Sequence, residues 1–361
     1  MTLQNSAKAP FPWFGGKSKA APLVWALLGD TDHYVEPFFG SGAVLLGRPH
    51  PCNRPYFSET VNDADGMVCN FWRSIQFAPD ATAEAASWPV IEADKSARQI
   101  ALLRWRDGAL DRLAGSADWC DPVMAGWWAW AVSVQIGPFS GDGPWTVDPV
   151  TGRILKQART DTRVPGVSRD LPHIADDGRG VNRASTRVPG VGDDPEFHPV
   201  TMPDLRRWFA YLSARLRHVR VLNGDWSRLA TNGATKTLSV RQGGVCGVFL
   251  DPPYADAADR ANGLYAVDSL TVAHDVREWC LTHGGDPDYR IVLAGFDGEH
   301  GTVLTDAGWT EHEWFTHGFL TGGYGNIRRA SGHQQHRERL WASPHCLALE
   351  TGPVVTQETL W

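Results

Sequence analysis

The strongest chemical signal in the 361-residue sequence is the tetrapeptide Asp251-Pro252-Pro253-Tyr254, which directly follows an apolar stretch at 248–250. The two prolines fix the backbone and remove two N–H donors, so the loop offers the Asp251 carboxylate and the Pro252 carbonyl as acceptors. Two acceptors suit an exocyclic amine on an aromatic ring, because holding its two hydrogens makes the delocalised lone pair available. Tyr254 adds a face on which an extruded base can stack. A plain proline turn is the alternative, which the apolar strand before it and the aromatic after it disfavour.

A second candidate site is the turn 36–42, which follows the apolar pair Tyr34-Val35. Gly40 and Gly42 would let the backbone approach a ligand closely, although a structural turn is an alternative. Neither the dinucleotide fingerprint GxGxxG nor the P-loop pattern GxxxxGK[ST] is present. The acidic Glu36 beside the turn suits a cationic group better than a pyrophosphate.

Two further groups of residues are weaker candidates. The stretch 11–18 combines aromatic residues, glycines and Lys17, which suits a loop that packs a flat or charged ligand, although a simple N-terminal arm would also fit. Acidic residues follow two predicted strands: Glu59 and Asp63 follow one, and Asp225 follows another. A carboxylate in such a position can accept hydrogen bonds from ribose hydroxyls. Helix capping is the alternative role, and Asp63 could serve it.

The elements that must position these residues alternate between strand and helix, which predicts an α/β fold with a parallel sheet. Short apolar runs that end in turn or acidic residues predict strands, and apolar residues at helical spacing predict helices. The expected strands are 34–35, 55–58, 219–222, 247–250 and 290–294, and the expected helices begin at 43 and cover 63–77 and 205–218.

The middle of the chain interrupts this alternation and predicts an insertion or a second domain. It holds a tryptophan-rich stretch, whose residues at 127–130 we expect in the core, and then a segment at 152–190 with a local charge of +4 in a chain of net charge −7. The hexapeptide Thr-Arg-Val-Pro-Gly-Val occurs at 162–167 and 186–191, which predicts two similar turns. Each turn presents an arginine, Arg163 or Arg187, that could contact guanine edges or phosphates, with an ordinary surface loop as an equal alternative.

Five stretches, taken in their order, resemble the motifs of the Dam-like, alpha-group DNA adenine-N6 methyltransferases. They are Pro12-Trp-Phe-Gly-Gly-Lys17, Val35-Glu-Pro-Phe-Phe-Gly-Ser-Gly42, Val61-Asn-Asp63, Asn223-Gly-Asp225-Trp226 and Asp251-Pro-Pro-Tyr254. The resemblance implies a Rossmann-like, S-adenosylmethionine-dependent methyltransferase domain formed by residues 1–77 and 201–361, with residues 78–200 as an inserted target-recognition region. The stretch Arg337-Glu-Arg-Leu-Trp341 fits a final strand of such a domain, with no chemical role.

The resemblance also implies roles for individual residues. The N-terminal loop would contact the cofactor, the turn after the first strand would surround its methionine part, Asp63 would hold its ribose with Glu59 as a nearby alternative, and Asp225 and Trp226 would lie by its adenine. Asp251 and Tyr254 would hold the target base. The expected cofactor-binding residues are Trp13, Gly16, Lys17, Glu36, Phe38, Gly40, Gly42, Asp63, Asp225, Trp226 and Asp251, and the catalytic tetrapeptide is Asp251, Pro252, Pro253 and Tyr254.

The expected function is methyl transfer to N6 of adenine in double-stranded DNA by base flipping. N4-cytosine methylation needs the same chemistry, although Asp rather than Ser at position 251 favours adenine. Methylation of RNA or of a protein amide and a catalytically silent DNA-binding relative are further alternatives. The sequence shows no zinc-type set of cysteines and histidines, no apolar run long enough for a membrane span and no secretion signal. We therefore expect a cytoplasmic protein that needs no metal and no obligate protein partner.

Overall fold

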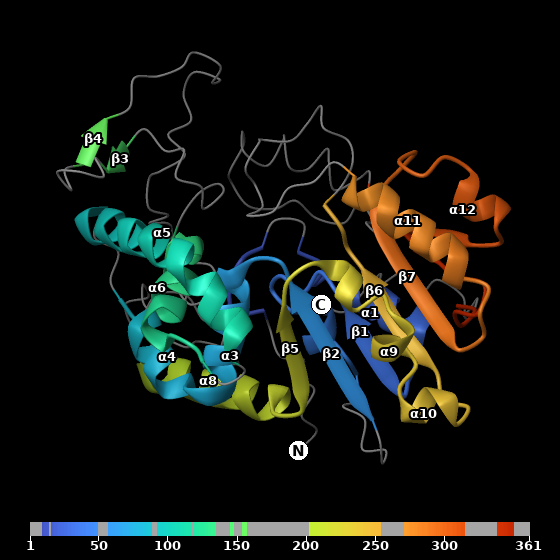
Figure 1. The fold of residues 1–361 in the computed structure, drawn as a ribbon, viewed down its shortest axis with the longest axis horizontal. Helices are drawn as coiled ribbons and strands as arrows, with labels where there is room; N and C mark the ends of the chain where they lie inside the picture. Colours follow the sequence, from blue (N-terminus) through green and yellow to red (C-terminus); the bar gives the residue numbers. More distant parts are fainter. Residues whose placement is uncertain are drawn as a thin grey trace, which may run out of the picture.

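The computed structural model describes residues 9–13, 16–49, 57–88, 92–116, 119–134, 145–147, 154–156, 202–253, 271–314 and 338–349. A seven-stranded sheet runs through its centre in the order β5-β2-β1-β6-β7-β9-β8 (Figure 1). The strands are β1 (His33–Glu36), β2 (Ser58–Asp63), β5 (Val219–Asn223), β6 (Cys246–Leu250), β7 (Tyr289–Phe296), β8 (Thr310–Glu313) and β9 (Glu338–Ala342). A separate antiparallel pair joins β3 (Trp145–Val147) to β4 (Ile154–Lys156).

The five strands β5, β2, β1, β6 and β7 are parallel, whereas β9 runs antiparallel to both β7 and β8. The expected parallel sheet is therefore confirmed for its first five strands and extended by an antiparallel edge. β1 and β6 are buried along their whole length, as expected for central parallel strands covered on both faces.

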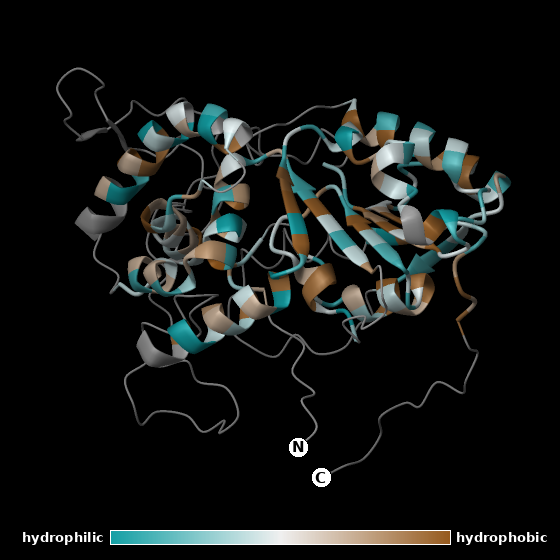
Figure 2. Ribbon diagram, turned by 60° about the horizontal axis from the view of Figure 1, so that its bottom comes forward, coloured by the Kyte–Doolittle hydropathy of each residue, from teal (hydrophilic) through white to brown (hydrophobic). Residues whose placement is uncertain are grey.

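Alternating residues of the central strands enter two separate hydrophobic cores, because successive side chains of a strand point to opposite faces. Phe249 packs into the core that also contains α1 (Ala21–Leu28) and α3 (Gly66–Phe77), while its neighbours Val248 and Leu250 pack into a second core with α11 (Val272–His283). Figure 2 shows the brown apolar segments of the strands enclosed by helices. The result is an α/β fold with helices on both faces of the sheet.

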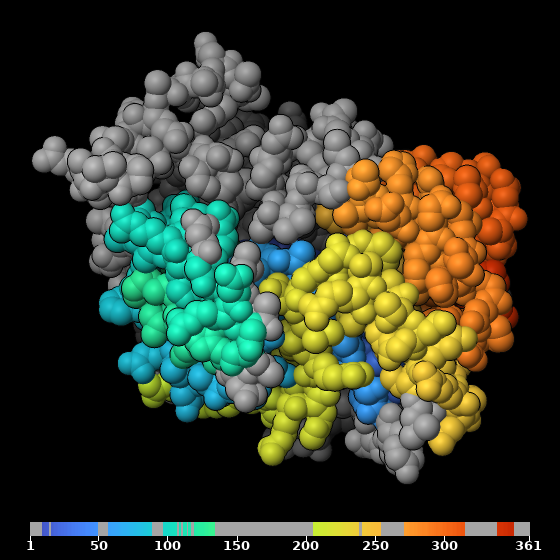
Figure 3. All heavy atoms as spheres, in the orientation of Figure 1, coloured from blue at the N-terminus to red at the C-terminus, as the bar shows by residue number. Residues whose placement is uncertain are grey.

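A group of helices packs beside the β5 edge of the sheet; in Figures 1 and 3 its members before residue 134 are light blue to blue-green, and α8 is yellow-green. It consists of α3, α4 (Pro79–Ala86), α5 (Glu92–Gly115), α6 (Pro122–Val134) and α8 (Met202–Leu216). Trp128 and Trp130 of α6 are buried in this group, which confirms their expected place in the core. The described helices between residues 78 and 134 thus pack directly on α3 and α8, and the division into domains at 77 and 201 stays a prediction.

The shorter elements link the strands on either side of the sheet. They are α2 (Ala43–Leu46), the 3-10 turn η1 (Trp226–Arg228), α9 (Asn232–Thr235), α10 (Leu238–Arg241) and α12 (Val303–Asp306). None of the described helices is long and apolar enough to cross a membrane.

One predicted strand was misplaced along the sequence. The strand expected at 55–58 is β2, which begins at Ser58 and ends at Asp63. Glu59 consequently lies near the amino end of the strand rather than after it. The remaining expected strands and helices are found within a few residues of their predicted positions, and the stretch that ends at Trp341 is the strand β9.

Candidate active site

A cavity lies at the carboxyl ends of four parallel strands, and it holds most of the residues that the sequence singled out. Segments that follow β1, β2, β5 and β6 line it, together with the N-terminal loop before α1. The chain moves outward from β1 through β2 to β5 and then returns to place β6 on the other side of β1, so the strand order reverses at this point. Ligands of open α/β sheets bind at such a reversal. The space amounts to about 920 Å³ including its opening to solvent.

The end of β1 and the turn after it supply a buried carboxylate to the cavity, and the backbone of this turn lies close to Trp13. Glu36 is the last residue of β1, and the Tyr34 hydroxyl donates a hydrogen bond to its Oε2 at 2.9 Å. Burial raises the pKa of Glu36 well above its usual range, against the hydrogen bond from Tyr34, and the Asp251 charge raises it further. Gly40 has a φ of +48°, and a Cβ there would lie 2.5 Å from Nε1 of Trp13. Gly40 is therefore required for Trp13 to pack against this turn.

Gly42 has a different environment from Gly40. Its φ is +68°, and a Cβ there would meet the rings of Phe39 and Trp72 at 2.9 and 3.0 Å. It directly precedes α2 and does not line the cavity. The structure thus places Gly42 under the turn, where it allows close packing, rather than beside a ligand.

Asp63 ends β2 and ties two of the cavity loops together. Its Oδ2 accepts a hydrogen bond from the Gly40 N–H at 2.8 Å, and its Oδ1 accepts one from the Asp65 N–H at 2.9 Å. Burial, with a smaller contribution from the Asp65 charge, raises the pKa of Asp63 to about 7. Helix α3 is capped by Asp65, whose side chain accepts from the Met67 N–H, so capping is not the role of Asp63.

Glu59, the alternative to Asp63, lies away from the cavity. Its two oxygens form buried ion pairs with Arg48 at 3.1 Å and with Arg215 at 2.6 Å. It does not line the cavity. The geometry assigns Glu59 to an internal ion-pair network and leaves Asp63 as the acid at the strand end.

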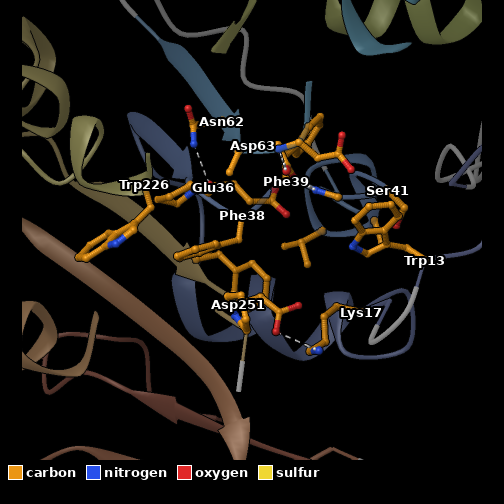
Figure 4. Close-up of a pocket in the computed structure, with 18 of the residues that line it drawn as sticks. Trp13, Lys17, Glu36, Phe38, Phe39, Ser41, Asn62, Asp63, Trp226 and Asp251 are labelled. Atoms are coloured by element: carbon orange, nitrogen blue, oxygen red, sulfur yellow. Dashed lines mark hydrogen bonds and ion pairs between the residues drawn. The ribbon is translucent and has the colours of Figure 1, made fainter. Parts of the chain in front are cut away.

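Two aromatic rings lie at one end of the cavity. Phe38 and Trp226 stack with ring centroids 6.2 Å apart and an angle of 26° between their planes (Figure 4). Asp225 holds the turn η1 by accepting a hydrogen bond from the Ser227 N–H at 2.9 Å, and it also lines the cavity. A flat apolar wall beside a carboxylate suits a heterocycle that carries hydrogen-bond donors.

A cluster of three charged side chains borders the opposite side of the cavity. Nζ of Lys17 lies 3.0 Å from Oδ1 of Asp251 and 3.5 Å from Oε2 of Glu338, and the Lys17 side chain is only 3% exposed. Figure 4 shows Lys17 and Asp251 directed toward each other across the cavity from Asp63. Burial raises the pKa of Glu338 to about 7, against the Lys17 charge, and the Asp251 charge raises it further. Sequence patterns gave Glu338 no role, because its contacts join segments more than 80 residues apart.

Acidic side chains outnumber basic ones in the lining of the cavity. Among the described lining residues the carboxylates are Glu36, Asp63, Asp65, Asp225 and Asp251, and Lys17 is the single cation. Such a cavity favours a ligand that carries positive charge and disfavours a pyrophosphate. Among the described residues no group of three or more histidine, cysteine or acidic side chains could hold a metal ion.

Most of the predicted site residues meet in this cavity, and the others lie elsewhere. Pro252 is buried beside it without lining it, whereas Tyr254, Arg163 and Arg187 lie outside the described residues. The predicted residues that line it are Trp13, Gly16, Lys17, Glu36, Phe38, Gly40, Asp63, Asp225, Trp226, Asp251 and Pro253.

Asn62 was not predicted as a site residue. Its Nδ2 donates to the Pro37 carbonyl at 3.1 Å and to the Gly224 carbonyl at 2.9 Å, so it joins the loops after β1 and β5. It lines the cavity and is buried. The only sequence signal was its position next to Asp63, where a polar residue interrupts a strand.

Comparison with known proteins agrees with this geometry. Residues 13–93, which contain the N-terminal loop, the turn after β1 and the end of β2, match the family described as D12 class N6 adenine-specific DNA methyltransferase. A search of curated proteins gave no match to the chain. Over residues 13–93 of its 361 residues, the chain is therefore similar to the D12 class N6 adenine-specific DNA methyltransferases.

Proposed function

We propose that this protein transfers a methyl group from S-adenosylmethionine to N6 of an adenine that has been turned out of double-stranded DNA. The family supplies the reaction class. The observation that carries the detailed proposal is the position of Asp251: its carboxylate lies at the border of the cavity, and the two residues that follow it are prolines, which have no N–H to donate.

The cavity fits the cofactor in its charge and in its shape. S-adenosylmethionine carries a cationic sulfonium and a cationic amino group, and when bound it supplies an activated methyl group. Five acidic side chains line the space, and Glu36 lies between Asp63 and Asp251 (Figure 4). Asp63 is suited to accept from the ribose hydroxyls, and Phe38 with Trp226 forms a flat wall for the adenine. Trp13, Gly16, Lys17 and Gly40 complete the wall on the side of the N-terminal loop.

The tetrapeptide would hold the reacting amine. The Asp251 carboxylate and the Pro252 carbonyl accept the two N6 hydrogens, which directs the nitrogen lone pair toward the cavity. In the transfer the bond between sulfur and the methyl carbon would break, with the electron pair left on sulfur to give the neutral thioether product, and a bond between N6 and that carbon would form. N6 would then lose one proton by way of the Asp251 carboxylate that accepts its hydrogen, and the proton would pass to solvent. Much of the rate comes from holding the two reactants at the proper distance and angle. Tyr254 is assigned the stacking of the base.

The fold and the partner follow from the same proposal. We assign the sheet and its helices to a Rossmann-like methyltransferase domain, residues 1–77 and 201–361, and residues 78–200 to target recognition. Arg163 and Arg187 are proposed DNA contacts within this insertion. We further propose that the protein acts in the cytoplasm, without a metal and without an obligate protein partner.

Substitution of Asp251 tests the proposal. Asp251→Ala removes one of the two acceptors, so methyl transfer to DNA should fall below detection. Lys17 retains its second carboxylate, Glu338, so the variant should remain folded and should still bind S-adenosylmethionine. Methyl transfer is measured with labelled cofactor, binding by calorimetry and folding by thermal denaturation. Wild-type activity in a folded variant would reject the assignment.

A further inference from the structure

The stretch that ends at Trp341 received no chemical role from the sequence, yet its strand brings a carboxylate to the active site. Glu338 is the first residue of β9 and pairs with Phe296, the last residue of β7. Because β9 is antiparallel to β7, its amino end lies at the edge of the sheet where the parallel strands have their carboxyl ends. Glu338 therefore reaches the cavity edge from a strand that runs in the opposite direction to β6 and β7.

The position of Glu338 is fixed by the packing of β9. Leu340 is buried in one hydrophobic core and Trp341 in the other, so the strand is anchored on both faces of the sheet. Glu338 itself is 6% exposed, and its Oε2 lies 3.5 Å from Nζ of Lys17. Because the strand holds the Glu338 carboxylate in place, this carboxylate cannot shift together with Lys17. It therefore fixes the position of the Lys17 ammonium.

We propose that Glu338 is a positioning residue for methyl transfer: it holds the Lys17 ammonium from the side opposite Asp251 and thereby fixes the Asp251 carboxylate against the target amine. This inference rests on the proposed role of Asp251. Glu338 does not line the cavity, and its ion pair with Lys17 connects it to the site, so it would act through Lys17. A role of this kind goes beyond holding the fold together, because it controls the reacting groups.

The physical argument concerns the sharing of one buried ammonium between two carboxylates. Lys17 is almost completely buried, and a buried ammonium must be compensated by charge. Asp251 is the nearer carboxylate, at 3.0 Å from the Lys17 ammonium. Glu338, at 3.5 Å, contributes the rest of the negative charge that balances this ammonium. Without the Glu338 charge, Lys17 would be drawn toward Asp251, and this carboxylate would become a weaker and displaced acceptor for the amine.

The charged groups around Glu338 determine how its effect depends on pH. Lys17 from the N-terminal loop and Asp251 after β6 act on it directly, and two charged neighbours, the half-buried Arg339 and the exposed Asp297, pair with each other at 3.9 Å. Since the pKa of Glu338 is raised to about 7, the carboxylate gains its charge as the pH rises through neutrality. At saturating cofactor and DNA, kcat should rise over the same range, because kcat reports on groups that ionise in the bound complex.

The test compares Glu338→Gln with Glu311→Gln. The control changes the same residue type on the adjacent strand β8, where Glu311 is 40% exposed and pairs with Arg339 at the surface. We expect Glu338→Gln to lower kcat by roughly 10- to 100-fold, the scale of a misplacement of about 1 Å at a reacting group. We also expect it to remove the rise of kcat near pH 7. Glu311→Gln should keep the wild-type kcat and pH profile.

A second variant separates positioning from stability. Glu338→Asp keeps the charge but shortens the side chain, so it should show a reduced kcat that still rises near pH 7. If thermal denaturation shows that Glu338→Gln does not fold, the kcat and pH profile of Glu338→Asp are used to test the proposal instead. A wild-type kcat and pH profile in folded Glu338→Gln, or a wild-type kcat in Glu338→Asp, would overturn the proposal. Absence of N6-methyladenine with the wild-type protein would instead reject the proposed function itself.

Discussion

Gly40→Ala tests whether the turn after β1 and the N-terminal loop form one wall of the cofactor site. The residue has a φ of +48°, and an alanine in this left-handed conformation costs roughly 1–2 kcal/mol. The new Cβ would also lie 2.5 Å from Nε1 and 2.7 Å from Cδ1 of Trp13, so the indole must move. Overpacking of this kind costs about 1–3 kcal/mol. The variant should therefore lose about 2–5 kcal/mol in its free energy of unfolding.

Gly301→Ala is the matched control, because it separates backbone strain from the clash. Gly301 has a φ of +55°, and a Cβ there meets no described atom within 4 Å. This variant should lose only the roughly 1–2 kcal/mol of left-handed strain and keep its cofactor affinity. In Gly40→Ala the displaced Trp13 should weaken S-adenosylmethionine binding by about 5- to 150-fold, which corresponds to about 1–3 kcal/mol.

Both quantities can be measured directly, by urea denaturation for stability and by isothermal calorimetry for the cofactor. The reasoning depends on the difference between the two glycine variants and not on either value alone. If Gly40→Ala binds S-adenosylmethionine as tightly as Gly301→Ala and loses no more stability, then Trp13 and the turn after β1 do not form one wall.

Three further predictions address the two acids of β2 and the charge of the cavity. Asp63→Asn should weaken S-adenosylmethionine binding by about 10- to 150-fold in calorimetry, because hydrogen bonds to a charged group contribute about 1.5–3 kcal/mol; unchanged affinity would exclude Asp63 from the site. Glu59→Gln should show the reverse pattern, a loss of roughly 3–5 kcal/mol in urea denaturation from the broken buried ion pairs with Arg48 and Arg215, at unchanged cofactor affinity in the folded protein. Cofactor binding should tighten as the pH rises from 6 to 8 and should release protons, since burial raises the pKa of Asp63 to about 7 and a cationic ligand favours its ionised form; calorimetry in buffers of different ionisation enthalpy measures this release, and proton uptake would contradict the sign.

The sequence was sufficient to predict the strands that carry their own hydrophobic signal. β6 and β7 are apolar runs that end in turn residues, and both were found where expected. β2 was displaced because its buried positions include Glu59, Thr60 and Asn62, which are polar. Glu59 and Asn62 are buried with partners from distant segments: Arg215 for Glu59 and the Gly224 carbonyl for Asn62. Local hydrophobicity cannot reveal a strand whose polar residues are satisfied by other parts of the chain.

Site residues could be predicted from the sequence where a short motif follows directly on a strand. Glu36, Gly40, Asp63 and Asp251 each follow or end a strand, and parallel strands bring such positions to one edge of the sheet. Glu338 was missed because it reaches this edge from an antiparallel strand, whose pairing with β7 is set by packing and not by a local pattern.

The same limit explains two smaller differences at the site. Gly42 was expected beside the cofactor, but it supports the turn from below, since the spacing of two glycines does not tell which of them faces a ligand. Asp65, two residues after Asp63, caps α3 and also lines the cavity. Choosing between these acids required the hydrogen bonds of the folded chain.

The central claim is tested most directly by mass spectrometry of nucleosides after incubation of the protein with labelled S-adenosylmethionine and double-stranded DNA. RNA of matched composition and the Asp251→Ala variant are the controls. We predict labelled N6-methyladenine in DNA with the wild-type protein, and no label in RNA or with the variant. Label on N4 of cytosine, label in RNA alone, or no transfer to DNA by a folded, cofactor-binding protein would contradict the account.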